Sequence, residues 1–363
     1  MDVDSMEKLT STIKEHDGYI NIITHNDPDG ILAAVITVRA LIKMDFDDIG
    51  IFFESPSAIQ SGNSFLLDEE DEGFVGGFII ILDLPHDEHA HVWIDHHDTT
   101  AVPSDASLFV FHDTGHSAAT LAYMFFKQLF KDGGDLIDED LLDYVDARDT
   151  GREPKRIAPE FEQFSMAIYD DRNDYDFMVD LIFDMVEIPD LTRIVGTPEI
   201  QRKVRHQQKK IKRGMRQLKD ILVFDDFNSF LEAIDEESNK ETTDKTKKRY
   251  FFYNGFLFYD ESDVGNQDDR EHHSAALPYF ILNPQVKKMG INYRYMLVYK
   301  GDDRNAVIHC TVSVNQARKD SRELDASKYA ETRGGGGHWY AAGFRMEIPD
   351  FFEVIKDIHE YYG

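Results

Sequence analysis

The sequence has almost no cysteine, no long apolar run and far fewer basic than acidic residues. Its single cysteine, Cys310, excludes an intrachain disulfide and a zinc cluster built on thiolates. No stretch approaches the about 18 uninterrupted apolar residues that a membrane-spanning helix needs. The first residues are acidic, whereas a secretory signal begins basic and continues apolar. We therefore expect a cytoplasmic protein with no membrane partner.

The excess of acidic over basic residues gives the chain an unusual charge. Its 39 Lys and Arg face 69 Asp and Glu, for a formal net charge of −30. Such a surface repels nucleic acid at long range, so a polyanionic substrate would need bound cations or a local basic patch. Two interpretations stay open and are compatible. The charge is a general adaptation for solubility or a salty interior, and a few of the carboxylates form a metal site.

The length of 363 residues predicts two domains. Residues 1–195 alternate apolar and helical patterns, which predicts a doubly wound, mostly parallel sheet with helices on both faces. Residues 196–224 are expected to form a linker helix, and residues 225–363 a smaller α/β domain. The expected strands are 19–24, 50–53, 78–83, 91–94 and 108–111, then 251–259, 293–299 and 306–314. The expected helices are 31–43, 116–131, 136–145, 197–222 and a closing segment near 351–361.

The linker helix is predicted to be strongly basic on the faces that its apolar positions leave open. Its basic residues are Arg202, Lys203, Arg205, Lys209, Lys210, Lys212, Arg213, Arg216 and Lys219. Two interpretations are equally supported. The basic face guides a phosphate backbone, or it is a solvated face that compensates its acidic surroundings.

Four polar clusters follow apolar elements of the first domain. They are His25-Asn-Asp27-Pro-Asp29-Gly30, Asp83, Asp95-His96-His97 and Asp146-Ala-Arg-Asp149-Thr-Gly151. In a doubly wound sheet, ligands bind beyond the carboxyl ends of the strands. Polar groups of this density are seldom packing residues, because burying them unpaired is costly. The sequence therefore predicts a functional site at this edge.

Imidazoles and carboxylates without thiolates favour Mn²⁺, with Mg²⁺, iron or Co²⁺ as alternatives, over a structural zinc ion. A bridging carboxylate that holds two divalent ions roughly 3.5–4 Å apart would generate hydroxide and hold a phosphoryl group for in-line displacement. The ions would also supply the positive field that the protein lacks.

Taken in order, these clusters resemble the motifs of the DHH phosphoesterase family. The segment Gly334-Gly-Gly-Gly-His-Trp-Tyr-Ala-Ala-Gly-Phe344 similarly resembles the signature of the DHH-associated C-terminal domain. Each motif alone is weak, but five in the family's order over nearly the whole chain are specific. The resemblance implies a DHH catalytic domain joined to a substrate-binding domain.

The resemblance also implies a role for each residue of the first domain. The implied metal ligands are His25, Asp27, Asp29, Asp83, His96 and Asp149, with Asp83 as the bridging ligand. His97 would face the substrate phosphate as a general acid, and Asp95 would orient it. For the fourth motif Asp149 is preferred, because Arg-Asp-Thr-Gly parallels a Thr-Asp-Thr-Gly segment of oligonucleotide-cleaving members. Asp146 is the alternative.

The glycine run is expected to bind substrate. Successive glycine amides that open toward a helix form an anion-binding nest. The predicted substrate-binding residues are Arg318, Arg333, Gly335, Gly336, Gly337 and His338. A tight packing turn is the alternative for the glycines. The sequence departs from the family at Asn315, where members often carry an Arg that grips a phosphate, so Arg318 is expected to substitute for it.

The expected function is hydrolysis of short single-stranded oligonucleotides, or of small nucleotides such as 3′-phosphoadenosine 5′-phosphate, in a cleft between the domains. The chain resembles the compact oligoribonuclease and nucleotide-phosphatase branch. The alternatives are a RecJ-like single-strand exonuclease, a cyclic-dinucleotide phosphodiesterase and an inactive nucleic-acid-binding scaffold. The partner is therefore a short single-stranded nucleic acid or a nucleotide, and a homodimer is left open.

Overall fold

The computed structural model of the chain describes residues 3–16, 18–60, 62, 64, 66, 76–97, 102–104, 109–130, 135–217, 222–238, 250–253, 256–260, 295–302, 307–314, 325–338, 341–347, 354–356 and 360. The chain divides into two compact units, Met1–His206 and Gln207–Gly363. No helix in the described ranges is both long and apolar enough to cross a membrane.

The first unit is built on a five-stranded sheet in which every pairing is parallel. Its strands are β1 (Ile20–Thr24), β2 (Ile49–Phe53), β3 (Phe78–Leu82), β4 (Val92–Asp95) and β5 (Phe109–His112). The order β2-β1-β3-β4-β5 reverses direction at β1, as in a doubly wound sheet. The predicted fold class is therefore confirmed. Neighbouring β1 and β3 are buried along their whole length, whereas the edge strands β2 and β5 are half-buried.

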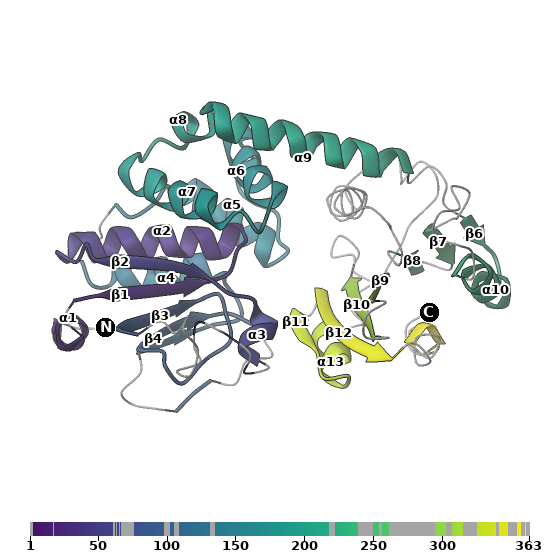
Figure 1. Ribbon diagram of the computed structural model, residues 1–363, viewed down its shortest axis with the longest axis horizontal. Helices are drawn as coiled ribbons and strands as arrows, with labels where there is room; N and C mark the ends of the chain where they lie inside the picture. The colour runs from purple at the N-terminus through teal and green to yellow at the C-terminus, as the bar shows by residue number, and fades with distance from the viewer. Residues whose placement is uncertain are drawn as a thin grey trace. The chain divides into compact units, whose positions relative to one another are not determined.

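Helices of this unit pack mainly over one face of the sheet (Figure 1). They are α1 (Val3–Glu15), α2 (Pro28–Lys43), α3 (Pro56–Gln60), α4 (Ala118–Lys127), α5 (Glu139–Asp149), α6 (Pro159–Asp170), α7 (Tyr175–Glu187) and α8 (Leu191–Val195). Helix α2 lies between the sheet and α7, and its buried residues belong to the main core with those of β1 and β3. A smaller core that includes Ile59 of α3 and Trp93 lies on alternate residues of the same strands.

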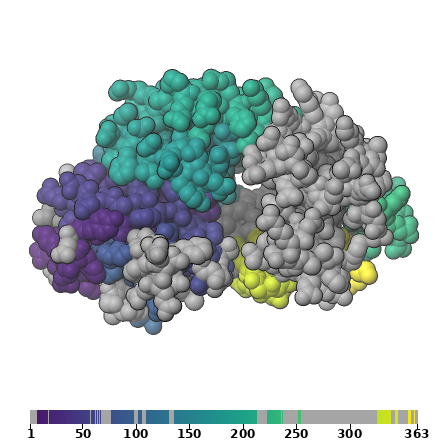
Figure 2. Space-filling view, in the orientation of Figure 1, coloured from purple at the N-terminus to yellow at the C-terminus, as the bar shows by residue number. Residues whose placement is uncertain are grey.

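Helix α9 (Pro198–Gln217) begins in the first unit and ends in the second. In the space-filling view, the teal surface of α6 and α7 lies against the purple N-terminal elements (Figure 2). The prediction of a uniformly solvated or nucleic-acid-binding basic face was wrong for Lys203 and Lys210, because both are buried. Lys203 pairs with Asp174, the N-cap residue of α7. The helix was also predicted to run to Leu222, which instead begins a strand.

The second unit contains a seven-stranded mixed sheet with the order β11-β12-β10-β9-β8-β7-β6. Its strands are β6 (Leu222–Phe224), β7 (Tyr250–Tyr253), β8 (Phe256–Asp260), β9 (Tyr295–Asp302), β10 (Val307–Val314), β11 (Gly336–His338) and β12 (Ala341–Glu347). Helices α10 (Phe227–Ser238) and α13 (Ala326–Glu331) accompany this sheet. The single strand predicted over 251–259 is two strands that pair antiparallel. A helical segment at 354–356 lies within the predicted closing helix.

Candidate metal centre

The polar clusters of the first unit meet at the carboxyl edge of the sheet. His25 follows β1, Asp83 follows β3, and Asp95 ends β4. Strands β1 and β3 are neighbours although β2 separates them in the chain, so their ends form the crevice at which a doubly wound sheet binds ligands. Three overlapping groups of possible ligand atoms occur here, each with its atoms within 4.8 Å of one another.

The loop after β1 is shaped by the start of α2. Asp27 is the N-cap residue: its Oδ1 accepts hydrogen bonds from the amides of Asp29 at 3.0 Å and Gly30 at 3.1 Å. Its Oδ2 lies 3.0 Å from Nδ1 of His25. A Cβ on Gly30 would overlap the His25 carbonyl oxygen and lie 2.9 Å from its carbonyl carbon. Gly30 therefore allows the loop to fold back, which places His25 beside Asp27.

Asp83 connects two parts of the site. It has φ 56°, a left-handed conformation that is uncommon for a residue other than glycine, and its amide donates to the Ile94 carbonyl at 2.9 Å. Its Oδ2 lies 3.5 Å from Nδ1 of His25, and its Oδ1 lies 3.3 Å from Nε2 of His96. The Asp83 carboxylate therefore faces both His25 and His96, in the arrangement of a bridging ligand.

The second group consists of Asp29, His96 and Asp149. Nε2 of His96 lies 3.3 Å from Oδ2 of Asp149 and 3.7 Å from Oδ2 of Asp29. Asp29 is held by the first amides of α4, Ala118 at 2.7 Å and Ala119 at 2.9 Å. Oδ2 of Asp149 is buried and accepts no hydrogen bond from the described residues. A buried carboxylate oxygen without a donor is costly, and a bound cation would satisfy it.

The electrostatics of the site also fit cations. Burial lowers the pKa of His25, but the Asp27 and Asp83 carboxylates raise it more strongly, to about 10. Burial likewise lowers the pKa of His96, and the charges of Asp149 and Asp83 bring it well above its ordinary value. Burial and the charge of Asp83 raise the pKa of Asp29 to about 7. The cluster thus retains protons that divalent ions would displace, and its oxygen and nitrogen donors suit Mn²⁺ or Mg²⁺.

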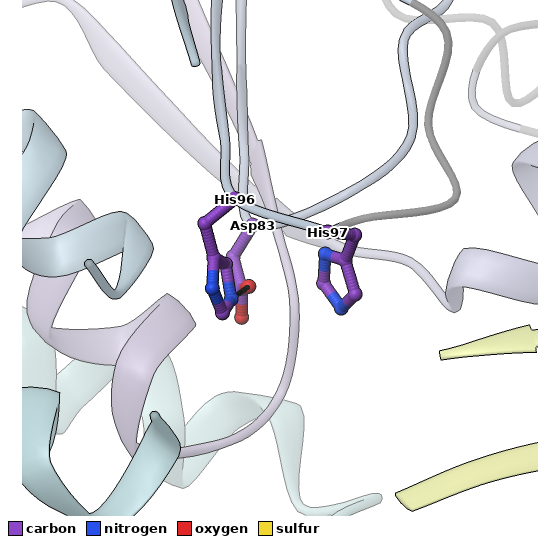
Figure 3. Close-up of side chains that lie close together, drawn as sticks. All are labelled: Asp83, His96 and His97. Carbon is purple, nitrogen blue, oxygen red and sulfur yellow. Dashed lines mark ion pairs between the residues drawn. The ribbon is translucent and has the colours of Figure 1, made fainter. Parts of the chain in front are cut away.

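His97 is oriented by its neighbour in the same motif. Its Nδ1 lies 2.7 Å from Oδ1 of Asp95, whose side chain is fully buried. A carboxylate can only accept, so Nδ1 carries the proton and Nε2 is directed elsewhere. Burial lowers the pKa of His97, but the charge and hydrogen bond of Asp95 raise it above its ordinary value. Figure 3 shows the Asp83 carboxylate beside the His96 ring, with the His97 ring next to them.

Asp146, the alternative in the fourth motif, has other contacts. Its Oδ1 accepts from the amide of Ser117 at 2.8 Å. Its Oδ2 accepts from Nε of Arg152 at 3.1 Å and from Nη2 at 2.8 Å. Asp146 belongs to none of the three ligand groups, whereas Asp149 does. Asp146 and Asp29 both accept hydrogen bonds from amides at the start of α4, which was not predicted from the sequence. The only sequence feature that pointed to this role was the presence of a second Asp, Asp146, three residues before Asp149.

The glycine run does not have the predicted shape. It follows α13 instead of leading into a helix, and Gly336–His338 form strand β11. The amides of Arg333 and Gly335 donate to the Ala330 carbonyl, so they close the helix end. A Cβ on Gly335 would overlap the Gly343 carbonyl oxygen. The expectation that the run opens toward a helix was therefore wrong, whereas its role in substrate binding stays a prediction.

The contacts of the other predicted substrate-binding residues do not indicate whether they bind substrate. The Arg333 guanidinium lies 3.9 Å from the Tyr329 ring centroid, and its Nη1 donates to the Thr332 hydroxyl at 2.9 Å. Gly337 and His338 pair with Ala342 and Ala341 of β12. Arg318 and Asn315 lie outside the described residues.

The fold matches that of a solved phosphodiesterase. No protein-family model matches the sequence, and no curated protein does. The chain is similar in structure to the pGpG-specific phosphodiesterase PggH from Vibrio cholerae, with a TM-score of 0.50 and 16% identity over 94% of this chain and 97% of that one. An exopolyphosphatase-related protein from Bacteroides fragilis has a TM-score of 0.48 and 14% identity, over 98% of this chain and 96% of that one. RecJ with Mn²⁺ from Thermus thermophilus has a TM-score of 0.48 and 12% identity, over 98% of this chain and 54% of that one. At these identities the likeness to PggH shows the fold, and the predicted resemblance is confirmed at that level.

Proposed function

We propose that the protein is a metal-dependent phosphoesterase that hydrolyses short single-stranded oligonucleotides or small nucleotides. The observation that carries the proposal is Asp83, whose two oxygens face His25 and His96. A carboxylate placed between two groups of ligands is the defining part of a two-metal phosphoesterase site.

Two of the three ligand groups would each hold one divalent ion. His25 and Asp27 would bind the first, Asp29, His96 and Asp149 the second, and Asp83 both. When bound, such ions supply Lewis acidity at the phosphoryl oxygens and an activated water. The protein contributes position: Asp29 is fixed by two amides of α4, and Asp27 by the cap of α2.

His97 is the proposed general acid. Its Nδ1 proton is held by Asp95, and the Asp95 carboxylate raises the pKa of His97, which favours a second proton on Nε2. Nε2 would then donate this proton to the leaving-group oxygen of the substrate. Asp95 acts through His97, because its hydrogen bond sets the orientation of the ring.

Short substrates are favoured by the charge of the chain. A net charge of −30 gives long nucleic acid no general attraction, so binding depends on contacts made near the scissile phosphate. The fold is shared with a protein described as specific for pGpG, a linear dinucleotide. Dinucleotides are therefore the first substrates to test, ahead of long single strands and cyclic dinucleotides.

The test is a panel of pGpG, pApA, 3′-phosphoadenosine 5′-phosphate, a cyclic dinucleotide and a 20-nucleotide single strand, each with Mn²⁺ and with excess chelator. We expect dinucleotide hydrolysis that requires the ion. Asp83→Asn should lower kcat by about a thousandfold, because loss of the bridging charge removes several kcal/mol of transition-state stabilisation. Asp45→Asn is the matched control, since exposed Asp45 also has a positive φ of 66°. Full hydrolysis in chelator, or by Asp83→Asn, would contradict the proposal.

A further inference from the structure

A short turn joins α6 to α7 and carries an arginine near the metal centre. It comprises residues 171–174, and Oδ1 of Asp171 accepts from the amide of Asn173 at 3.0 Å. Asp174 ends the turn and caps α7 through the amide of Phe177. The turn therefore has a defined conformation in which the arginine, Arg172, is exposed.

The turn is anchored on two sides. On one side, Nδ2 of Asn26 donates to the Arg172 carbonyl at 2.9 Å. Asn26 lies between the proposed ligands His25 and Asp27, so this bond ties the turn directly to the metal loop. On the other side, two residues of α9 bind the last residue of the turn and the residue that precedes it. Lys203 pairs with Asp174, and Nδ1 of His206 lies 2.8 Å from Oδ1 of Asp170.

The Arg172 side chain is directed over Tyr169, the residue before the last in α6. Its Cζ lies 4.8 Å from the ring centroid, within the range of a cation–π contact. Although Tyr169 is 43% exposed, desolvation of its hydroxyl raises its pKa, the Arg172 guanidinium lowers it, and the Asp27 and Asp149 carboxylates raise it further. The charges of both ligand groups thus reach the Tyr169 hydroxyl, and the guanidinium lies beside that hydroxyl.

A phosphate approaching the metal centre would meet mostly carboxylates, so a cation at its edge is chemically useful. A guanidinium can bind two phosphate oxygens in parallel, and stacking on an aromatic ring reduces the entropy lost on binding.

We propose that Arg172, held over Tyr169 and tied by its carbonyl to Asn26, binds the non-bridging oxygens of the substrate phosphate. This assignment rests on the proposed phosphoesterase function. Arg172 is then a substrate-binding residue that the catalytic unit itself supplies. Tyr169 and Asn26 are positioning residues, because they act through Arg172.

The test compares Arg172→Gln with Arg193→Gln, a matched control that removes the same charge from exposed Arg193 in α8. Affinity for adenosine 5′-monophosphate and for adenosine is measured by calorimetry with Mn²⁺ present, next to metal content and KM for pApA. We expect Arg172→Gln to weaken binding of the monophosphate and raise KM about ten- to a hundredfold, the usual loss for a charged hydrogen bond. Adenosine affinity and metal content should not change. The monophosphate affinity of Arg172→Lys should lie between those of the wild type and Arg172→Gln, because lysine keeps the charge but cannot bind two phosphate oxygens in parallel.

Three outcomes would overturn the assignment. Wild-type affinity for the monophosphate in Arg172→Gln shows that the guanidinium does not bind phosphate. An equal loss in Arg193→Gln shows only a general charge effect. Loss of metal with unchanged monophosphate affinity shows that Arg172 acts through Asp27. The binding assay also separates the two proposals: a wild type that binds the monophosphate through Arg172 but hydrolyses nothing would refute only the proposed function.

Discussion

Asp146 and Asp149 lie one helical turn apart, and the structure predicts opposite consequences when each is replaced by Ala. Asp146 accepts three hydrogen bonds, one from the Ser117 amide and two from Arg152. Asp149 has a buried oxygen to which no described donor is bonded, and it faces His96 at 3.3 Å. Asp146→Ala should therefore destabilise the fold without removing a metal ligand. Asp149→Ala should remove a metal ligand and leave the stability of the fold nearly unchanged.

The magnitude for Asp146 follows from its contacts. Ser117 is fully buried, so its amide would lose its acceptor at a cost of about 1–3 kcal/mol. The Arg152 side chain is 39% exposed and water can solvate it, so its two bonds add only about 1 kcal/mol. The total of about 2–4 kcal/mol corresponds to about 4–16 °C in Tm for a unit of this size.

Asp149→Ala has a different balance. Burial raises the pKa of Asp149 well above its ordinary value, the charge of His96 lowers it, and the neighbouring carboxylates raise it further. The charged side chain is therefore a poor contributor to folding. Its removal should change the free energy of unfolding by less than about 1 kcal/mol. Affinity for the second ion should fall by at least about a hundredfold, since even residues that only orient a ligand are worth ten- to a hundredfold.

The assay is denaturant unfolding in chelator, followed by metal content after dialysis against Mn²⁺. The first measurement reports only the fold, and the second reports only the site. The reasoning is refuted if Asp146→Ala loses metal at unchanged stability, which would make Asp146 the ligand. It is also refuted if Asp149→Ala binds two ions per chain with wild-type affinity.

Two further predictions concern the frame around the site. Gly30→Ala should destabilise the protein by about 1–3 kcal/mol and weaken metal binding, because its Cβ would overlap the His25 carbonyl. Gly196→Ala should change stability by less than about 1 kcal/mol, since its Cβ meets atoms no closer than 3.1 Å. Equal unfolding midpoints for the two variants would contradict this. Asp174→Asn should cost about 2–3 kcal/mol at pH 7, because Lys203 is buried. The Lys203 hydrogen bond lowers the pKa of Asp174 below its ordinary 3.8, so this contribution is present above that pH and is lost as the pH falls through the folded value. A cost that stays constant in unfolding titrations down to pH 3 would refute the ion pair.

Local patterns were reliable where one element decides its own structure. The apolar runs at β1 and β3 predicted buried parallel strands, because such strands are covered on both faces. The helix after β1 was predicted from Ile31 but begins at Pro28, because Asp27 caps it and a proline suits the first turn. The segment predicted as one strand over 251–259 likewise forms two antiparallel strands, and its Asn-Gly dipeptide, favoured in hairpins, was the sequence signal for this.

Patterns failed where a segment's partner is distant in the chain. The glycines at 334–337 were predicted to form an anion nest. Their amides and strand register instead depend on α13 and on β12, which follows them. Lys203 and Lys210 belong to a run of basic residues that is typical of a solvated helix face, yet both are buried. Asp174 neutralises the charge of Lys203. Sequence spacing contains no information on such partners, because a glycine or a lysine suits either environment.

The residue types and their order along the chain determined the class of site by themselves. Carboxylates and imidazoles at the ends of apolar strands allow few chemistries, since burying them without ligands is unfavourable. Only the tertiary structure decided which oxygen faces which nitrogen. It placed Asp83 between His25 and His96, gave Asp146 to Ser117 and Arg152, and brought Arg172 to the metal loop from 146 positions beyond Asn26. The physical reason is that strand order in a doubly wound sheet, and the return of a distant turn, bring together residues whose separation along the chain says nothing about their distance in space.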